Sequence, residues 1–505
     1  MSIEAADDHW ADDALGRKSL ATYLSRSICG QVDRQAKFGK GLTISLDAEW
    51  GAGKTFFVSR WQQDLRLANH PVVYFDAWEN DIGDEASVAV MSAVLATLRE
   101  WSAQIPLADK ARDAISKMTR DATKKLRRAI VPAASVIAKS ALKKATGIAV
   151  DELITAFSDE GDGEPAKVGE ADNSETDKAL DKLFELKLKE HQSRKNALLD
   201  FRSAMEKLLR EIYEHTHAAS PLFIFVDELD RCRPSYALKL LEEIKHIFGV
   251  AGVAFVVSTN LAQLQSAVRS LYGSDFDGSA YLKRLFDREY VLPTPDNLRY
   301  AAIAIPHDSA LRGVPALHWR PGSRVTGSQL DLDWAVVAEM FALDLRSQKQ
   351  VATLADEVAH SLSSKYSLFA FWLFFLCALF FKDRRFLEKC LADDRMPHST
   401  FEEHLTKLLR ASPRIEWDYR SREQPYETNK RAITIVRFAR ECYALSRDSS
   451  AEFYEKFNAD KKEFPATLID LLIDQITASS GVAGTFSAYG SIVKNAGYYL
   501  GDSTE

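Results

Sequence analysis

The chain has 505 residues, a formal net charge of -7 and a pI near 6.0, and 46% of its residues are hydrophobic. At roughly 100–200 residues per domain, this length predicts about two to four folding units, each able to bury a core. The mild acidity argues against a protein that wraps nucleic acid with its whole surface, although a local basic patch stays possible.

The cysteines and the N-terminus indicate the compartment. Five cysteines lie far apart and form no C-x-x-C pair, namely Cys29, Cys232, Cys377, Cys390 and Cys442. This usage predicts a reducing compartment and no structural zinc. Residues 1–20 are acidic and contain no apolar run of the kind that a secretory signal needs. We therefore expect a cytoplasmic protein.

The first elements follow the order strand, glycine turn, helix. The apolar stretch 42–46 (LTISL) leads into a glycine-containing turn, and residues 55–68 show apolar side chains at helical spacing. A second strand candidate, 71–78, and a helix, 85–101, come next. Strand, turn and helix in this order are what a phosphate-binding loop requires.

Residues 102–205 form an insertion of different composition. A basic stretch and an alanine-rich stretch are followed by residues 159–177, which are rich in glycine and acids and show no apolar period. We expect a disordered linker there. A charged helix, 178–215, then leads back to the core.

Two near-continuous apolar runs follow the insertion. Residues 221–226 end in a group of acids, residues 252–260 end in Ser-Thr-Asn, and the amphipathic stretch 236–248 lies between them. Such apolar strands are typical of a parallel sheet covered on both faces. From about Asn297 onward, helical patterns dominate.

The turn before the first helix matches a phosphate-binding loop. In the pattern G-x-x-x-x-G-K-[ST], backbone N–H groups point toward the anion at a helix N-terminus. Gly53, Lys54 and Thr55 fill the last three positions and Gly51 adds flexibility, but Ala48 replaces the first glycine. Alanine is tolerated there if φ stays negative and strains the turn if φ is positive. We expect the nucleotide to contact Trp50, Gly51, Ala52, Gly53, Lys54, Thr55 and Phe56.

Nucleotide hydrolysis also needs acids that face this loop. Five apolar residues precede Asp227, which places it at a strand end, and Glu228 follows directly. We expect Asp227 to hold Mg²⁺ and Glu228 to orient and deprotonate the attacking water. In the alternative, both acids only cap the helix that begins near Pro234.

Three polar residues further along have two interpretations each. Asn260 lies at a strand end, where its amide could contact the γ-phosphate or the water, or could cap the next helix. Arg284 and Arg288 come just before a segment rich in β-forming residues. Either could stabilise charge on a neighbouring subunit's nucleotide, or a helix-end arginine could simply pair with Asp287.

Together these segments resemble the KAP family of P-loop NTPases, a branch of the STAND ATPases related to AAA+ proteins. The resemblance rests on EWGAGKT, VVYFDAW, FVDELDRCRP and YLKRLFDREYVLPTP, and it covers roughly residues 20–300. Two positions depart from the usual pattern. Glu228 replaces an Asp, which is compatible with hydrolysis, and Asp76 replaces an Asn, which puts that residue's contact in doubt.

The resemblance implies an ATPase with a helical lid that self-associates. It implies that Lys54 bridges the β- and γ-phosphates and that Thr55 and Asp227 hold Mg²⁺. It further implies that Glu228 activates water and that Asn260 is the sensor. The same resemblance places such proteins in prokaryotic anti-phage defence operons.

The resemblance also makes Arg346, in ALDLRSQKQV, a candidate for an arginine that reaches the γ-phosphate, with a surface arginine as the other interpretation. By the same resemblance, Asp230 and Arg231 have a structural or inter-subunit role. No N-K-x-D motif follows the acidic strand, which favours ATP over GTP.

Two segments raise the question of a membrane. Residues 129–150 are apolar but contain Lys139, Lys143 and Lys144, too much charge for a spanning helix. The basic residues between Lys110 and Lys144 could bind anionic lipid, nucleic acid or an acidic partner, or could form a solvated helix face.

The second segment is Tyr366–Phe381. Its sixteen uncharged residues would span only about 24 Å as a helix, short of the ~30 Å hydrocarbon core. We expect a buried helix, with a subunit interface or a re-entrant membrane segment as alternatives.

The sequence as a whole predicts an α/β fold, namely a P-loop NTPase parallel sheet with a helical insertion, followed by an α-helical lid and a C-terminal helical domain. The expected ranges are 1–101 and 206–300 for the two parts of the core, 102–205 for the insertion, 301–360 for the lid and 361–505 for the C-terminal domain.

We expect a Mg²⁺-dependent ATPase that acts as a conformational switch or assembly ATPase. Its expected partners are further copies of itself and a protein effector from the same operon. The alternatives are a scaffold that binds nucleotide without hydrolysing it and an ATPase that DNA stimulates.

Overall fold

The computed structural model describes residues 9–82, 86–104, 109–130, 196, 199–247, 249–314, 328–362, 370–392, 396–411, 414–420, 428–445 and 493–494. The chain divides into two compact units. The first comprises Met1–Trp10, Arg17–Glu49 and Lys54–Leu292, and the second comprises Ala11–Gly16, Trp50–Gly53 and Pro293–Glu505.

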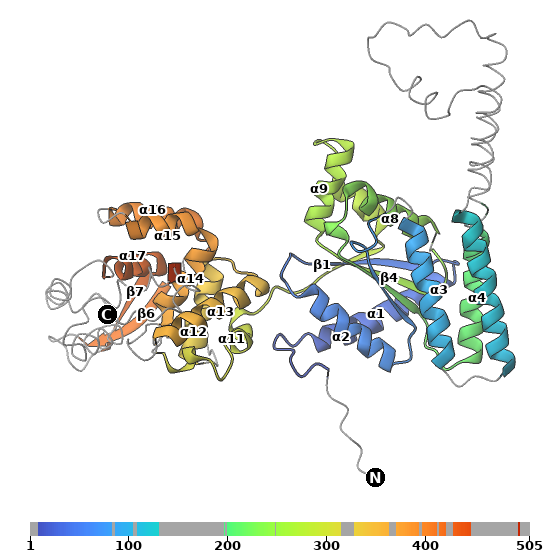
Figure 1. The fold of residues 1–505 in the computed structure, drawn as a ribbon, viewed down its shortest axis with the longest axis horizontal. Helices are drawn as coiled ribbons and strands as arrows, with labels where there is room; N and C mark the ends of the chain where they lie inside the picture. The colour runs from blue at the N-terminus through green and yellow to red at the C-terminus, as the bar shows by residue number, and fades with distance from the viewer. Residues whose placement is uncertain are drawn as a thin grey trace, which may run out of the picture. The chain divides into compact units, whose positions relative to one another are not determined.

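A five-stranded parallel sheet forms the centre of the first unit (Figure 1). The strand order is β2-β3-β4-β1-β5. The strands are β1 (Leu42–Asp47), β2 (Val72–Asp76), β3 (Leu222–Asp227), β4 (Val253–Thr259) and β5 (Arg288–Val291). Every residue of β3 and β4 is buried, because helices cover both faces of a parallel sheet. The α/β fold and the parallel sheet expected from the apolar runs are confirmed.

Helices pack on both faces of this sheet (Figure 1). They are α1 (Lys18–Ala36), α2 (Lys54–Leu67), α3 (Ala86–Gln104), α8 (Pro234–Ile247), α9 (Leu261–Tyr272) and α10 (Gly278–Leu285), and α4 (Asp109–Ile130) packs against α3. Successive side chains of a strand point to opposite faces. Phe223 and Phe225 of β3 accordingly contact Trp61 of α2, whereas Ile224 and Val226 join the cluster that contains α3 and α8.

The sheet register aligns the polar strand ends. Asp76 of β2 lies beside Asp227 of β3, and Asp47 of β1 lies beside Thr259 of β4. Because all five strands run parallel, their carboxyl ends meet at one edge, where α/β proteins bind ligands. The loop between β1 and α2 leaves the sheet at this same edge.

The second unit is mainly helical. Its helices are α11 (Asn297–Ala304), α12 (Gln329–Met340), α13 (Leu345–Leu362), α14 (Ala370–Lys382), α15 (Arg384–Ala392), α16 (His398–Leu408) and α17 (Ile435–Leu445). An antiparallel pair, β6 (Arg414–Arg420) and β7 (Thr428–Thr434), adds a hairpin that the sequence analysis does not include. The helical region expected after the NTPase core is confirmed. The finer division into insertion, lid and C-terminal domain stays a prediction.

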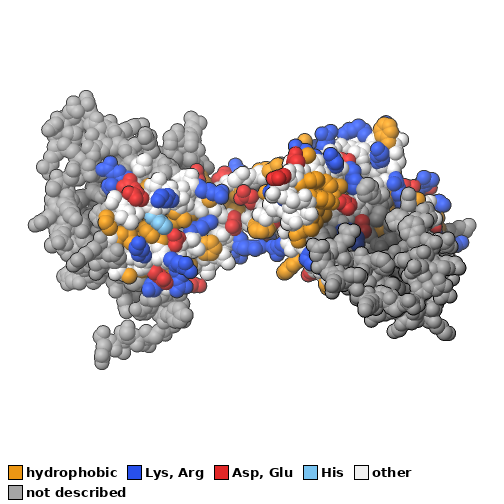
Figure 2. All heavy atoms as spheres, turned by 90° about the horizontal axis from the view of Figure 1, so that it is seen from above, with side chains coloured by type: hydrophobic (Ala, Val, Ile, Leu, Met, Phe, Trp, Pro, Cys, Tyr) orange, Lys and Arg blue, Asp and Glu red, His pale blue; other side chains and the backbone are white. Residues whose placement is uncertain are grey.

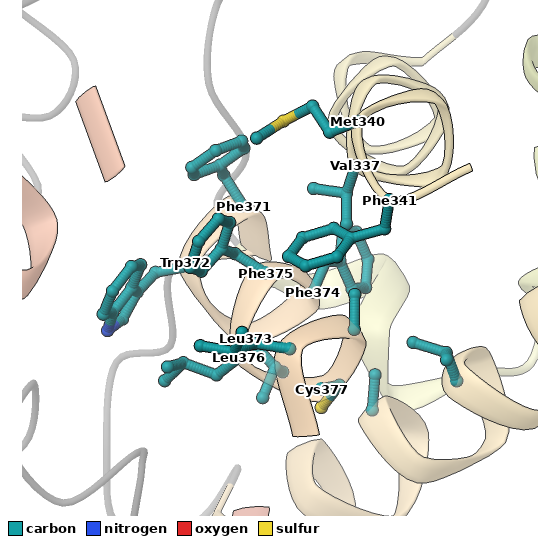
Figure 3. Close-up of a cluster of buried hydrophobic side chains, with 14 of the residues drawn as sticks. Val337, Met340, Phe341, Phe371, Trp372, Leu373, Phe374, Phe375, Leu376 and Cys377 are labelled. Atoms are coloured by element: carbon teal, nitrogen blue, oxygen red, sulfur yellow. The ribbon is translucent and has the colours of Figure 1, made fainter. Parts of the chain in front are cut away.

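The apolar segment near residue 370 is a buried helix. All side chains of Ala370–Leu379 in α14 are buried, and Figure 3 shows several of them packed against α12. The Phe374 ring meets the Trp334 ring edge-on, with centroids 5.0 Å apart. This burial confirms the core helix expected over Tyr366–Phe381, of which residues 366–369 lie outside the described ranges.

Within the ranges that the structure describes, no helix is both long and apolar enough to cross a membrane. The expected linker at 159–177 and the lysines at 139, 143 and 144 lie outside those ranges. On the face drawn in Figure 2, basic and acidic side chains lie interspersed.

Candidate functional site

The loop between β1 and α2 has the backbone that a phosphate loop needs. Gly51 and Gly53 have φ values of 74° and 81°, in the left-handed region that favours glycine. Ala48 has no positive φ, and its N–H donates to the Thr259 carbonyl at 3.2 Å. The alanine in place of the first glycine therefore introduces no backbone strain.

Lys54 begins α2, and its side chain folds over the loop. The ammonium group donates to the carbonyl oxygens of Ala48 at 2.8 Å and Glu49 at 3.4 Å. The residue is only 8% exposed. A buried lysine needs such partners, and phosphate oxygens at the loop would offer stronger ones.

Thr55 and Asp227 come together at the end of the sheet. The Thr55 hydroxyl donates to Oδ2 of Asp227 at 3.5 Å. The Asp227 carboxyl is almost fully buried, and burial is the main cause that raises its pKa. The Glu228 backbone N–H, which donates to Oδ1 at 3.0 Å, and the charge of Lys54 oppose that rise. A hydroxyl and a carboxylate so placed are the oxygen ligands that Mg²⁺ prefers.

Glu228 follows in a left-handed conformation, with φ 58° and ψ 26°. It precedes a 3-10 turn, η1 (Leu229–Arg231), without making a side-chain cap, and its carboxylate pairs with Arg231 at 2.7 Å. Burial, followed by the charge of Asp227, raises the pKa of Glu228. The side chain of Asp227 thus contacts Thr55 and that of Glu228 contacts Arg231. These contacts differ from the capping of α8 that the alternative interpretation expects.

Asn260 caps α9. Its Oδ1 accepts the backbone N–H groups of Ala262 at 3.0 Å and Gln263 at 3.3 Å. The capping interpretation of this residue is therefore correct for its carbonyl oxygen. A contact between its amide and the γ-phosphate stays a prediction.

The candidate arginines are all exposed. Arg284 lies in the last turn of α10 and Arg288 lies on β5. The Asp287 carboxylate is engaged by Lys245 at 2.6 Å and by the Thr43 N–H at 2.8 Å. Among the described residues, no Arg–Asp287 ion pair is formed. Arg346 lies exposed on α13 of the second unit.

Residues after β2 contact the segment that carries the two acids, and the residue types alone do not predict these contacts. The Ala77 N–H, after β2, donates to the Asp227 carbonyl at 3.0 Å. Asp81 accepts the backbone N–H and Nε of Arg233 at 2.7 and 2.8 Å. The guanidinium carbon of Arg231 lies 5.7 Å from the centre of the Trp78 ring. Apart from Asp81, these residues fall within the VVYFDAW and FVDELDRCRP motifs, but the motifs do not indicate which partners they contact.

Comparison with known proteins agrees with this site. The model of the KAP family P-loop domain matches residues 17–296, more than half of the chain. The chain belongs to the KAP family of P-loop NTPases. The KAP match includes all five strands of the sheet and both the lysine-bearing loop and the acids.

Two solved structures are similar to this KAP protein at low identity. One, the Aeropyrum pernix ORC2 protein (ADPNP-ADP complexes), is 12% identical with a TM-score of 0.30, and the match covers 92% of this chain and 94% of that one. The other, C. elegans PCH-2, is 10% identical with a TM-score of 0.27, covering 74% and 73%. With TM-scores this low, neither likeness bears on function. No curated protein matches the KAP chain significantly.

Proposed function

We propose that this KAP protein binds ATP with Mg²⁺ and hydrolyses the γ-phosphate. The observation that carries the proposal is the approach of Thr55, at the start of α2, to Asp227, at the end of β3. A phosphate loop and a metal-binding acid act on one nucleotide only if the fold brings them to the same place. The family supports nucleotide binding, and the choice of ATP rests on the sequence argument above.

Thr55 and Asp227 would hold the metal ion. Both supply oxygen donors, and their oxygens lie 3.5 Å apart, within reach of a single cation. Mg²⁺, when bound, neutralises charge on the phosphate oxygens.

The remaining residues would act on the nucleotide and the water. Lys54 would exchange its two loop carbonyls for oxygens of the β- and γ-phosphates. Glu228 would accept the proton of the attacking water. Asn260 would orient that water through its amide, while its carbonyl oxygen keeps capping α9. Arg284, exposed on α10, would serve the nucleotide of a second copy.

Hydrolysis by purified protein tests this proposal directly. We expect Mg²⁺-dependent release of phosphate from ATP by the wild type, and loss of release with retained ATP affinity in Glu228→Gln. We expect Lys54→Ala to lose affinity as well. Equal background rates in the wild type and Glu228→Gln, with nucleotide still bound, would instead support the non-hydrolysing scaffold.

We further propose that the output is a conformational change that a partner protein reads, and that copies of the chain associate when nucleotide binds. Self-association, a protein effector and a role in anti-phage defence rest on the family resemblance. Particle mass measured with and without ATP and Mg²⁺ tests the association: an unchanged mass removes the basis for Arg284 acting on a second copy.

DNA-stimulated hydrolysis is the alternative function, and its support comes from α4. The exposed cations Arg112, Lys117, Arg120 and Lys124 outnumber the exposed acids Asp113 and Asp121, and Asp121 pairs with Lys125 at 2.9 Å. An excess of cations attracts phosphates. Hydrolysis measured with added DNA and RNA checks this alternative.

A further inference from the structure

Arg231 holds the side chain of Glu228. The Nε atom of Arg231 lies 2.7 Å from Oε2 of Glu228, and the two side chains are 34% and 18% exposed. The guanidinium carbon lies 5.7 Å from the centre of the Trp78 ring, a distance at which the ring attracts a cation. The carboxylate is therefore paired with a cation that an aromatic ring also contacts.

The backbone on both sides fixes this arrangement. Glu228 has φ 58°, which non-glycine residues seldom adopt, and its carbonyl accepts the Arg231 N–H at 3.2 Å. This turn brings the two side chains together. The turn that carries Trp78 is joined to the same segment, because Asp81 accepts two hydrogen bonds from Arg233.

The pairing affects what Glu228 can do. A general base needs a lone pair within hydrogen-bond reach of the proton that it removes. The guanidinium of Arg231 holds Oε2 of the carboxylate, so this oxygen is not presented to a water molecule while the pair is closed.

We propose that Arg231 is a positioning residue that keeps Glu228 away from the attacking water until their ion pair opens. Trp78, whose ring centre lies 5.7 Å from the guanidinium carbon, adds a further attraction to the closed arrangement. The basal rate of hydrolysis is then limited by the fraction of molecules in which the pair is open. This inference rests on the proposed hydrolysis and identifies how the same site is restrained.

Steady-state ATP hydrolysis by the full-length protein tests the restraint. Arg231→Met removes the charge but keeps the length of the side chain, and we expect kcat to rise about threefold to fivefold with KM unchanged, since a partly exposed ion pair opens at modest cost. Arg231→Lys keeps the cation and should stay near the wild-type rate. Trp78→Leu leaves the ion pair in place but removes the ring, and should raise kcat by a smaller factor.

A matched control comes from the second unit. Arg384 also pairs through Nε with a glutamate, Glu388 at 3.0 Å, and lies 5.2 Å from the ring of Phe380. Arg384→Met removes the same kind of contact from a residue that is not part of the proposed catalytic machinery, and should leave kcat unchanged.

The direction of the change decides the matter, because a damaged fold lowers activity and does not raise it. An unchanged or lower kcat in Arg231→Met that still binds a fluorescent ATP analogue would overturn the proposal. If Arg231→Met loses nucleotide binding, Trp78→Leu takes its place, and the absence of a rise there overturns it.

One further variant separates this proposal from the proposed function. Glu228→Gln combined with Arg231→Met should show no rise over Glu228→Gln alone, because no base remains to be released. If the wild type hydrolyses ATP and Glu228→Gln does not, while Arg231→Met shows no rise, only the restraint fails. If the wild type and Glu228→Gln are equal at background, both proposals fail.

Discussion

The hydroxyl of Thr55 lies 3.5 Å from the carboxylate of Asp227, although 172 positions separate the two residues in the sequence. Thr55 is in the first turn of α2 and Asp227 ends β3, so only the sheet order brings them together. A hydroxyl and a buried acid at this distance form the oxygen pair around which the proposed Mg²⁺–ATP site is built.

Thr55 provides a first test of that pair. We expect Thr55→Ala to weaken Mg²⁺–ATP binding by about tenfold or more, because a hydrogen-bonding group that contacts a charge is lost. Thr55→Ser keeps the hydroxyl and should bind nearly as the wild type does. Titration with a fluorescent ATP analogue, with Mg²⁺ and with EDTA, measures both. Equal affinities for Thr55→Ala and Thr55→Ser would remove Thr55 from the metal site.

Gly51 can be tested against Gly39, since both have positive φ, 74° and 65°. A Cβ at Gly51 would lie 2.3 Å from Oδ1 of Asp344, whereas a Cβ at Gly39 meets nothing within 4 Å. Gly39→Ala should therefore cost about 1 kcal/mol from backbone conformation alone. Gly51→Ala should cost more and should lose nucleotide affinity. Thermal unfolding and nucleotide titration compare them.

The double variant Gly51→Ala, Asp344→Ala separates the two causes of the Gly51 effect. Asp344→Ala removes the clashing carboxyl group but keeps the Asp344 Cβ, 2.8 Å from the added Cβ, and loses two hydrogen bonds with Ser347. Compared with Asp344→Ala alone, the double variant should therefore show a smaller loss than Gly51→Ala shows in the wild type. An equal loss would show that the clash is not the cause.

Ala48 leads to the opposite expectation. Because its φ is not positive, restoring the glycine of the motif in Ala48→Gly removes no strain. We expect unchanged ATP affinity and a slightly lower Tm, since glycine increases the freedom of the unfolded chain by an equivalent of about 0.5–1 kcal/mol. A marked gain in affinity would mean that the alanine does weaken the loop.

The sheet and the loop were predictable because their signals are local. The run before Asp227 is apolar throughout, the run before Asn260 is apolar up to Val257, and Lys54 and Thr55 follow a glycine turn. Strand, loop and acid could therefore each be recognised within about ten residues. The proximity of the loop and the acid followed from one general rule, that the carboxyl ends of parallel strands lie at one edge of the sheet.

Other features depend on conformations that no local pattern indicates. The pairing of Glu228 with Arg231 requires a left-handed φ at a glutamate, which residue type disfavours. Whether Asn260 caps or senses could not be decided from the sequence, because both roles suit an asparagine at a strand end. The β6–β7 hairpin was missed although a local signal is present, because Arg414–Arg420 (RIEWDYR) alternates polar and apolar residues, the pattern of a strand.

The core helix of the second unit gives a stability prediction. Phe374 of α14 is fully buried against Trp334, so Phe374→Ala should lower the free energy of unfolding by about 3–5 kcal/mol through the cavity that it leaves. Phe381, near the end of the same helix, is 42% exposed, and Phe381→Ala should have a much smaller effect. Chemical denaturation followed by circular dichroism compares the two. Similar losses would contradict the burial of α14.

Asn260 allows the cap and the proposed sensor to be separated, because aspartate caps a helix as well as asparagine but has no amide N–H. Asn260→Ala loses the two bonds to Ala262 and Gln263 and should lower stability by about 1 kcal/mol. Asn260→Asp should keep the Tm of the wild type while kcat for ATP falls, since the donor proposed to orient the water is gone. If Asn260→Asp retains both stability and kcat, Asn260 is a helix cap alone, and the orientation of the water must come from another residue at the edge of the sheet.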